Sequence, residues 1–324
     1  MTTNGERRQA RQVNGDNVII EAAWLYYNDG LNQSDIATKL NVSRATVVNY
    51  LQEARERNFV TITMAPEVFA GHRLSLELEG KFGLAKALVI PDGTGDQASV
   101  SNRVARGASR LLPSLLGPGD RLGVAWGKTI HDVAEYLEPA VIADLTVLQL
   151  VGSMTTPYGF SADVCSSYVA RRLSARCINL HVPAILSDQA VAAQLRKEML
   201  IANQLDEISN FNKTIFAVGP CLPNSHVVSS GVANVEELQW YIDHGAKGVL
   251  CGRFIDKDGN GIEGPLDKRM MGVSLDRMRK PEIGILVSAG HDRVNAAVAA
   301  MRGDYVTHLV THQSSAEAML LKPS

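Results

Sequence analysis

The chain has 324 residues, of which 45% are hydrophobic and 20% are charged, and its formal net charge is −2. This length favours two domains, and the composition is typical of a soluble globular protein. The charge excludes a strongly basic or acidic protein, and no apolar run is long enough to cross a bilayer.

The first residues and the cysteines indicate a cytoplasmic protein. Residues 1–16 are polar and carry three arginines without an apolar segment, so they predict a disordered arm and no signal peptide. The four cysteines lie far apart and form no C-x-x-C pair. This spacing is typical of reduced cytosolic thiols and argues against a disulfide framework and a zinc site. We expect no metal and no cofactor.

Residues 17–65 have the pattern of three short helices followed by a strand. Apolar residues repeat at helical spacing over 17–28, and Ser34 and Ser43 are suited to cap a second and a third helix. The stretch "FVTITM" at 59–64 alternates like the strand in the wing of a winged helix. Two helices joined by a turn of about three residues match the helix-turn-helix motif, whose second helix enters the major groove of DNA.

Polar residues on and near the third predicted helix are the candidates for DNA contacts. Arg44, in the first turn, can bind guanine with both ends of its guanidinium group, and Asn49 can bind adenine or a phosphate. Hydroxyl groups and the Gln33 amide are suited to contacts with the DNA backbone, which position a protein without reading the sequence. The candidates are Gln33, Ser43, Arg44, Thr46, Asn49 and Tyr50.

Charge leaves a second interpretation of this unit open. Residues 1–64 hold seven lysines and arginines and seven aspartates and glutamates, whereas a DNA-binding domain usually has a basic surface. A small helical subdomain with a solvated polar face has the same pattern. Residues 66–84 predict a linker helix, and its apolar stripe suits either packing within the chain or contact between two copies. The stripe consists of Leu74, Leu78 and Phe82.

From residue 85 to residue 324, short apolar runs alternate with helical segments, one of them over 99–116. Such runs predict a doubly wound, mostly parallel α/β sheet with helices on both faces. Sheets of this class bind ligands beyond the carboxyl ends of their strands. The predicted strands are 87–91, 121–126, 145–151, 177–183, 214–219, 247–252, 282–290 and 305–312.

Several loops that follow predicted strands carry groups that bind anions. In "GVAWGKTIHD" (123–132), a strand leads into Gly127, Lys128 and Thr129 at the start of a helix. Free backbone N–H groups, a hydroxyl and an ammonium group meet there. The loop lacks the G-x-x-x-x-G-K spacing of a P-loop. Other strand ends offer Gly152, Ser153, Arg253, Asp256 and Arg293.

Five stretches, spread over nearly the whole chain, carry a family resemblance. They are "GLNQSDIATKLNVSRATVVNYLQEARERNFVTI" (30–62), "GVAWGKT" (123–129), "FNKTIFAVGP" (211–220), "GAKGVLCGRFIDKDGNG" (245–261) and "LDKRMMGVSLDRM" (266–278). They resemble the SorC family of bacterial sugar-responsive transcription regulators. The resemblance implies an N-terminal DNA-binding domain. It also implies a second domain that resembles sugar-phosphate isomerases and deaminases and binds a phosphorylated sugar. Residue by residue, it implicates in effector binding Gly127, Lys128, Thr129, Gly152, Ser153 and Asp256.

The chain departs from the family pattern at three places. The family often has Ser-Arg in place of Val48-Asn49, Gly-Gly-x-x-Lys in place of Gly290 to Arg293, and Val-Thr-Asp in place of Val310 to His312. The first difference leaves the operator sequence open. The other two leave the effector open, including whether it is phosphorylated, because arginine keeps the charge of lysine but binds with a planar fork.

The competing interpretation is an isomerase or deaminase with an accessory helical domain. Isomerisation needs a base, for which Asp256, His291 and His312 are candidates, whereas Schiff-base chemistry needs a buried lysine, and residues 130–195 contain none. We expect a regulator and no enzyme: a sequence-specific DNA-binding protein that controls a carbohydrate or polyol operon in response to a sugar, polyol or sugar phosphate. A homodimer or homotetramer is expected, since dimers bind paired half-sites. Repression and activation both stay open.

Overall fold

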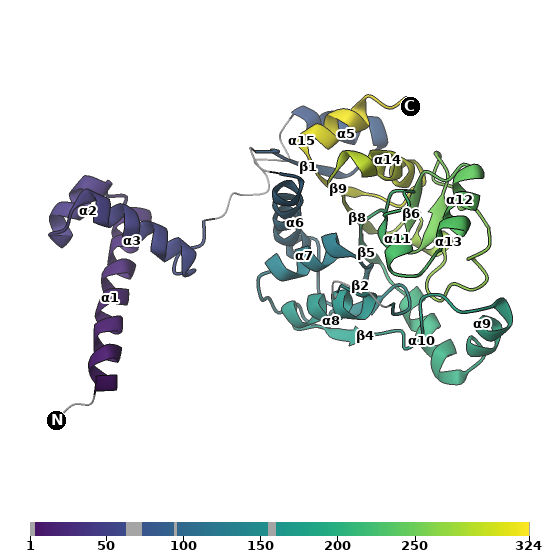
Figure 1. Ribbon diagram of the computed structural model, residues 1–324, viewed down its shortest axis with the longest axis horizontal. Coiled ribbons are helices and arrows are strands. Elements are labelled where there is room, and N and C mark those ends of the chain that lie inside the picture. The colour runs from purple at the N-terminus through teal and green to yellow at the C-terminus, as the bar shows by residue number, and fades with distance from the viewer. Residues whose placement is uncertain (1–3, 63–72, 94–95, 155–159, 324) are drawn as a thin grey trace. The chain divides into compact units, whose positions relative to one another are not determined.

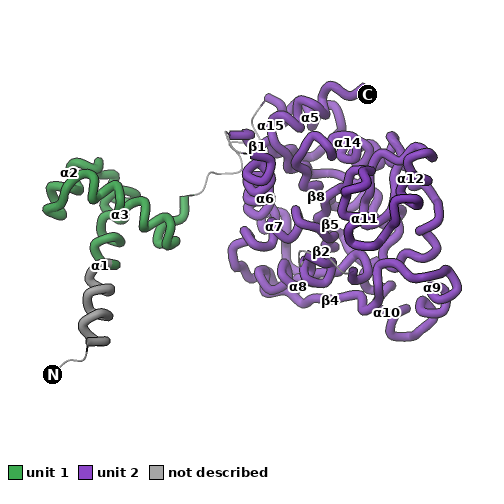
Figure 2. The backbone as a smooth tube through the Cα atoms, viewed as in Figure 1, with its two compact units in different colours: residues 1–64 green, residues 65–324 purple. Residues whose placement is uncertain are grey.

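The chain divides into two units, residues 1–64 and residues 65–324 (Figure 2). The computed structural model describes residues 4–62, 73–93, 96–154 and 160–323, with side chains from residue 16 onward. Within these residues, no helix is both long and apolar enough to span a membrane. Each unit has its own hydrophobic core.

The N-terminal unit consists of helices α1 (Asn4–Tyr27), α2 (Gln33–Leu40) and α3 (Arg44–Glu56). Ser43 caps α3 as predicted, because its Oγ accepts a hydrogen bond from the Thr46 N–H at 3.0 Å. The cap of α2 is Asn32, whose Oδ1 accepts from the N–H groups of Ser34 and Asp35 at 2.9 and 3.0 Å. Our assignment of Ser34 as that cap is therefore wrong.

Two other features of this unit differ from the sequence prediction. Helix α1 begins at Asn4, inside the stretch 1–16 for which we predicted a disordered arm. Residues 6–12 of this stretch read ERRQARQ and so consist entirely of residues that favour helix. The wing strand predicted over 59–64 is absent from residues 59–62, and residues 63 and 64 lie outside the described part. A strand needs a partner, and the described residues of this unit supply none.

A parallel sheet forms the centre of the C-terminal unit, and seven strands of it lie within the described residues (Figure 1). Their order across the sheet is β1-β9-β8-β5-β2-β3-β4, so the predicted α/β class is confirmed. The strands are β1 (Lys86–Ile90), β2 (Arg121–Val124), β3 (Thr146–Gln149), β4 (Arg176–Ile178), β5 (Lys213–Phe216), β8 (Ile283–Val287) and β9 (His308–His312).

Helices cover both faces of this sheet. One core cluster joins the sheet to α6 (Gln97–Ser114), α7 (Lys128–Tyr136) and α8 (Ala162–Arg172). The other joins it to α5 (Arg73–Phe82), α10 (Met199–Ser209), α14 (Val294–Arg302) and α15 (Gln313–Leu320). The shorter helices are α9 (Gln189–Leu195), α11 (His226–Ser229), α12 (Val235–Asp243), α13 (Leu275–Met278) and the 3-10 turn η1 (His291–Arg293).

Helix α5 corresponds to the predicted linker helix. Its Leu74 and Leu78 are buried, and Phe82 packs against the same cluster, which also contains residues of α15. The apolar stripe thus packs within its own unit. Residues 67–72, where the predicted helix would begin, lie outside the described residues.

The predicted strand 247–252 leaves the main sheet. Its residues form β6 (Gly248–Leu250), which pairs in antiparallel fashion with β7 (Arg253–Ile255). Cys251 (φ 49°) and Gly252 (φ 79°) make the two-residue turn between them, and positive φ at both positions is typical of tight hairpins. Sequence inspection missed β7 because three residues are too short to show a period.

The strand order contains one reversal of winding. From β2 the chain continues outward through β3 to β4, whereas from β5 it continues the other way through β8 to β9. β2 and β5 are neighbours, with Leu122 beside Lys213 and Val124 beside Ile215. The loops that follow these two strands therefore run apart, which leaves a crevice at their carboxyl ends.

Candidate functional site

A cavity of about 390 Å³ lies at the carboxyl ends of β2 and β5. Four segments that are distant in the sequence contribute to its lining. They are residues 125–129 after β2, residues from 217 to 227 after β5, Val249, Cys251 and Gly252 of the β6–β7 hairpin, and Asp292 with Arg293 after β8. The cavity thus coincides with the reversal of winding.

The loop after β2 presents the start of helix α7 to the cavity. Gly127 precedes the helix with φ 114° and ψ 168°, a conformation that favours glycine, and no side chain caps α7 among the described residues. The first backbone N–H groups of a helix have no partner inside the helix. Those of Lys128 and Thr129 can therefore bind an anion, which the helix dipole also attracts.

Two cationic side chains stand at this cavity. The Lys128 ammonium group lies 2.5 Å from Oδ2 of Asp132, one turn along α7. Arg293 donates from Nη1 to the carbonyl oxygen of Ala289 at 3.0 Å, and its Nε lies 4.0 Å from Oδ2 of Asp292. Both cations have partners within the chain, but each keeps further donors for a bound anion.

A histidine reports the electrostatic character of the cavity. The ring of His226 is half-buried and stacks on Phe160 with centroids 5.2 Å apart. Burial lowers the pKa of His226, and the positive charges of Arg293 and Lys128 lower it further. Burial disfavours a charge of either sign, so only the two nearby positive charges favour a negatively charged ligand.

The cavity also contains a buried hydroxyl group that lacks a partner. Ser225 is 6% exposed and lines the cavity, and its Oγ makes no hydrogen bond to any described residue. Most buried polar groups in proteins are hydrogen-bonded. A ligand hydroxyl or phosphate oxygen would supply the missing partner.

The structure brings together four of the eight candidate effector residues, namely Gly127, Lys128, Thr129 and Arg293. Gly152 and Ser153 lie after β3 and outside the lining. A Cβ at Gly152 would stand 2.6 Å from the carbonyl oxygen of Pro183, so close packing requires the glycine. The Asp256 carboxylate accepts the N–H groups of Asp258 and Asn260 at 2.9 and 2.8 Å, and these bonds close a surface turn.

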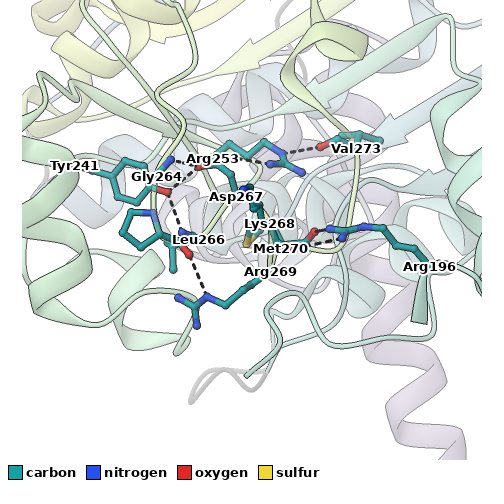
Figure 3. A network of polar contacts seen from close by, with 11 residues as sticks. Arg196, Tyr241, Arg253, Gly264, Leu266, Asp267, Lys268, Arg269, Met270 and Val273 are labelled. Atoms are coloured by element: carbon teal, nitrogen blue, oxygen red, sulfur yellow. Dashed lines mark hydrogen bonds and ion pairs between the residues drawn. The ribbon is translucent and has the colours of Figure 1, made fainter. Parts of the chain in front are cut away.

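Arg253 belongs to a network of polar contacts outside the cavity lining (Figure 3). It donates from Nε to the Val273 carbonyl at 2.9 Å and from Nη1 to Oδ1 of Asp267 at 3.0 Å. The other oxygen of Asp267 accepts the Tyr241 hydroxyl at 2.7 Å and the Gly264 N–H at 2.9 Å. Through Asp267 and Tyr241, these hydrogen bonds hold the segment after β7 against α12.

None of the three candidate bases lines the cavity. Asp256 closes its surface turn, and His291 is exposed on η1. His312 is 2% exposed and engages Gly290, Asp92 and two serines. The positions of these groups give the isomerase or deaminase interpretation no support from geometry.

In the N-terminal unit, the candidate DNA contacts gather around the start of α3. Arg44 and Asn49 are exposed, while Thr46 and Tyr50 are half-buried. Arg44 Nε lies 3.4 Å from Oε1 of Gln33, so the first turns of α2 and α3 meet across the connection. The hydroxyl groups of Ser43 and Thr46 bond to each other at 2.8 Å. This arrangement is that of a helix-turn-helix motif.

Comparisons with known proteins agree with this architecture. Residues 67–321 match the family described as "Putative sugar-binding domain". The crystal structure of the full-length sorbitol operon regulator SorC from Klebsiella pneumoniae has the same fold, with a TM-score of 0.79 and 22% identity over 94% of this chain and 98% of that one. This chain belongs to the SorC family of sugar-binding transcriptional regulators.

Two relatives of this SorC-family protein have high coverage in both chains. It is 36% identical over 310 residues to the transcriptional regulator YjhU of Escherichia coli, which is 94% of each chain. It is 30% identical over 303 residues to the deoxyribonucleoside regulator of Bacillus subtilis, which covers 93% of this chain and 96% of that one. The predicted family resemblance is thereby confirmed.

Sequence reasoning missed the contribution of the loop after β5 to this SorC-family cavity. Asn224, Ser225 and His226 of this loop line the cavity and were not among the candidates; Trp126, which follows β2, was also not among them. The rule that ligands bind beyond the carboxyl ends of strands applied to this loop as well, since it follows the predicted strand 214–219. No glycine–cation motif marked it, so the rule alone was too general to select these residues.

We predict that Arg253 contributes to stability and not to ligand binding. Arg253→Met leaves the partly buried Asp267 carboxylate without its cation, so the free energy of unfolding should fall by about 2 kcal/mol, less than for a fully buried pair. Urea unfolding followed by circular dichroism measures the change. Lys257→Met is the matched control, because it removes an exposed pair with Asp258 and should cost at most about 0.5 kcal/mol. Unchanged stability with weakened ligand binding would contradict this assignment.

Proposed function

We propose that this protein binds operator DNA sequence-specifically through α3 and regulates a carbohydrate or polyol catabolic operon in the cytoplasm. A sugar, polyol or sugar phosphate binds in the cavity between the carboxyl ends of β2 and β5. Its binding shifts the population between forms that bind DNA tightly and forms that do not. The protein acts as a homodimer or homotetramer, because a single helix-turn-helix offers few base contacts.

The observation that carries this proposal is the set of groups in the cavity. Backbone N–H groups at α7, Lys128 and Arg293 suit a phosphate or another anionic group, whereas Ser225 and Thr129 suit hydroxyl groups of a sugar. The curated relatives support the same reading, since one is named a deoxyribonucleoside regulator and another a sorbitol operon regulator.

We also propose that the protein performs no catalysis on its effector. The candidate bases Asp256, His291 and His312 lie outside the cavity lining. The relatives are named as transcriptional regulators. Incubation of the protein with candidate sugar phosphates, followed by product analysis, tests this part of the proposal, and turnover of any of them would overturn it.

Fluorescence anisotropy tests the proposal as a whole. The purified protein is titrated onto labelled DNA from upstream of its own operon at fixed salt, in the presence of a panel of sugars, polyols and their phosphates. We expect tight binding that one member of the panel shifts. Absence of sequence-specific binding would contradict the proposal.

Arg44→Ala should reduce discrimination between operator and scrambled DNA. Loss of a two-pronged contact to guanine costs about 1–3 kcal/mol, so operator affinity should fall by about tenfold or more, while affinity for scrambled DNA should change little. Arg55→Ala is the matched control, because it removes the same charge from the exposed last turn of α3. Equal losses of operator affinity in both variants would contradict base recognition by Arg44 and would leave it a general electrostatic contact.

Ser225→Ala should weaken the binding of the effector without lowering the stability of the protein. The hydroxyl has no partner among the described residues, so its removal should leave the unfolding midpoint unchanged. The concentration of the active panel member that half-releases DNA should rise about tenfold, as for one lost hydrogen bond at a buried site.

Ser288→Ala is the control for this variant. Ser288 is also a buried serine whose hydroxyl lacks a partner among the described residues, but it lies outside the cavity lining. An unchanged effector response in Ser225→Ala, or an equal loss in Ser288→Ala, would contradict the proposed site.

A further inference from the structure

Hydrogen bonds to the His312 side chain connect the carboxyl ends of β9, β1 and β8 beside the cavity. His312, the last residue of β9, places Nδ1 2.7 Å from Oδ1 of Asp92, which follows β1. Its Nε2 lies 3.0 Å from the backbone nitrogen of Gly290, which follows β8. The hydroxyl of Ser315, in the first turn of α15, is 2.7 Å from the same Nε2.

These contacts determine where the imidazole carries its proton. The Gly290 N–H can only donate, so Nε2 must be an unprotonated acceptor and Nδ1 must carry the hydrogen that bonds Asp92. Burial raises the pKa of Asp92, but hydrogen bonds from Ser314 and His312 outweigh it and keep that pKa below its ordinary value. An ionised Asp92 accepts the Nδ1–H and fixes the neutral tautomer. A doubly protonated ring could not accept the Gly290 hydrogen bond.

The hydrogen-bonded series Asp92–His312–Ser315 resembles the catalytic triad of a hydrolase. The burial and hydrogen bonds of these residues, however, exclude attack by Ser315 on a substrate. Ser315 is fully buried and lies outside the cavity lining. Nε2, which would have to take the serine proton, already accepts the Gly290 N–H. The group therefore holds the backbone in place.

The backbone that it holds is the loop that carries Arg293 to the cavity. Gly290 has φ 113°, and a Cβ there would stand 2.5 Å from Oδ1 of Asp292, so no other residue fits without displacement. Three residues later, the Arg293 side chain donates a hydrogen bond to the Ala289 carbonyl oxygen and lines the cavity. Gly290 and Arg293 are the first and last residues of this short turn. A hydrogen bond that holds Gly290 therefore also restricts the position of the Arg293 side chain.

We propose that His312 is a positioning residue for effector binding: its neutral Nε2 anchors Gly290 and thereby holds the Arg293 guanidinium group at the cavity. Two of the three departures from the SorC-family pattern are thereby connected, because His312 bonds to Gly290 at the start of the turn that ends in Arg293. The inference rests on the proposed function in so far as the cavity binds an anionic effector group. The anchoring of the loop itself does not depend on the identity of that effector.

Hydrogen–deuterium exchange measures the anchoring directly. Peptides that cover residues 288–294 are followed by mass spectrometry in the full-length protein and in three variants. His312→Leu removes the acceptor, and exchange in the loop should accelerate about tenfold, as for one lost hydrogen bond. His312→Gln supplies an amide oxygen as a substitute acceptor and should restore slow exchange. Thr311→Val, which alters a neighbouring buried hydroxyl that has no partner among the described residues, should change nothing.

Binding of inorganic phosphate, measured by isothermal titration calorimetry at fixed ionic strength, tests the link to Arg293. His312→Leu should raise the dissociation constant about tenfold, as expected when one charge-assisted hydrogen bond is lost. The same substitution in an Arg293→Ala background should have no further effect, because His312 acts through the arginine. His312→Gln should bind as the unaltered protein does.

The outcomes separate this inference from the proposed function. Unchanged loop exchange in His312→Leu would overturn the anchoring, and an undiminished effect in the Arg293→Ala background would overturn the action through Arg293. If the unaltered protein binds neither phosphate nor any member of the sugar panel, the proposed function fails and the inference fails with it as a statement about effector binding. The exchange data would then still decide whether His312 anchors the loop.

Discussion

The reversal of winding between β2 and β5 is the constraint on which the rest of the site depends. Both strands run parallel and adjacent, so the loops at their carboxyl ends start side by side and then diverge toward opposite edges of the sheet. The divergence opens the cavity, exposes the first turn of α7 and leaves space for Arg293 from the next strand. Specific side chains then decide what this space can bind.

Those side chains combine positive charge with unsatisfied hydrogen-bonding groups. Burial lowers the pKa of His226, and the positive charges of Arg293 and Lys128 lower it further. The carboxylates of Asp132 and Asp292 lie beside these two cations. Ser225 keeps a buried hydroxyl group without a partner among the described residues. The anchored Gly290 loop makes the placement of Arg293 a property of the fold, so an effector need not order this side chain when it binds.

The sequence was informative where one residue pattern has one physical cause. Strands buried on both faces must be apolar, which made the strands of the sheet visible, and the Gly127-Lys128-Thr129 loop was recognisable because a helix starts directly after a strand. Strand order is not encoded in such patterns. Arg253 was therefore grouped with the effector residues although β7 turns back on β6, and Ser225 was missed because its nearness to Thr129 exists only once β5 pairs with β2.

A crystal structure of the protein with the compound that shifts its operator binding would locate the effector. We expect electron density for that compound between the carboxyl ends of β2 and β5. Its anionic group should lie within hydrogen-bonding distance of the Lys128 and Thr129 N–H groups and of Arg293, and a hydroxyl should lie at Ser225. Density at the loops of Gly152 or Asp256, with none in the cavity, would refute the proposed site.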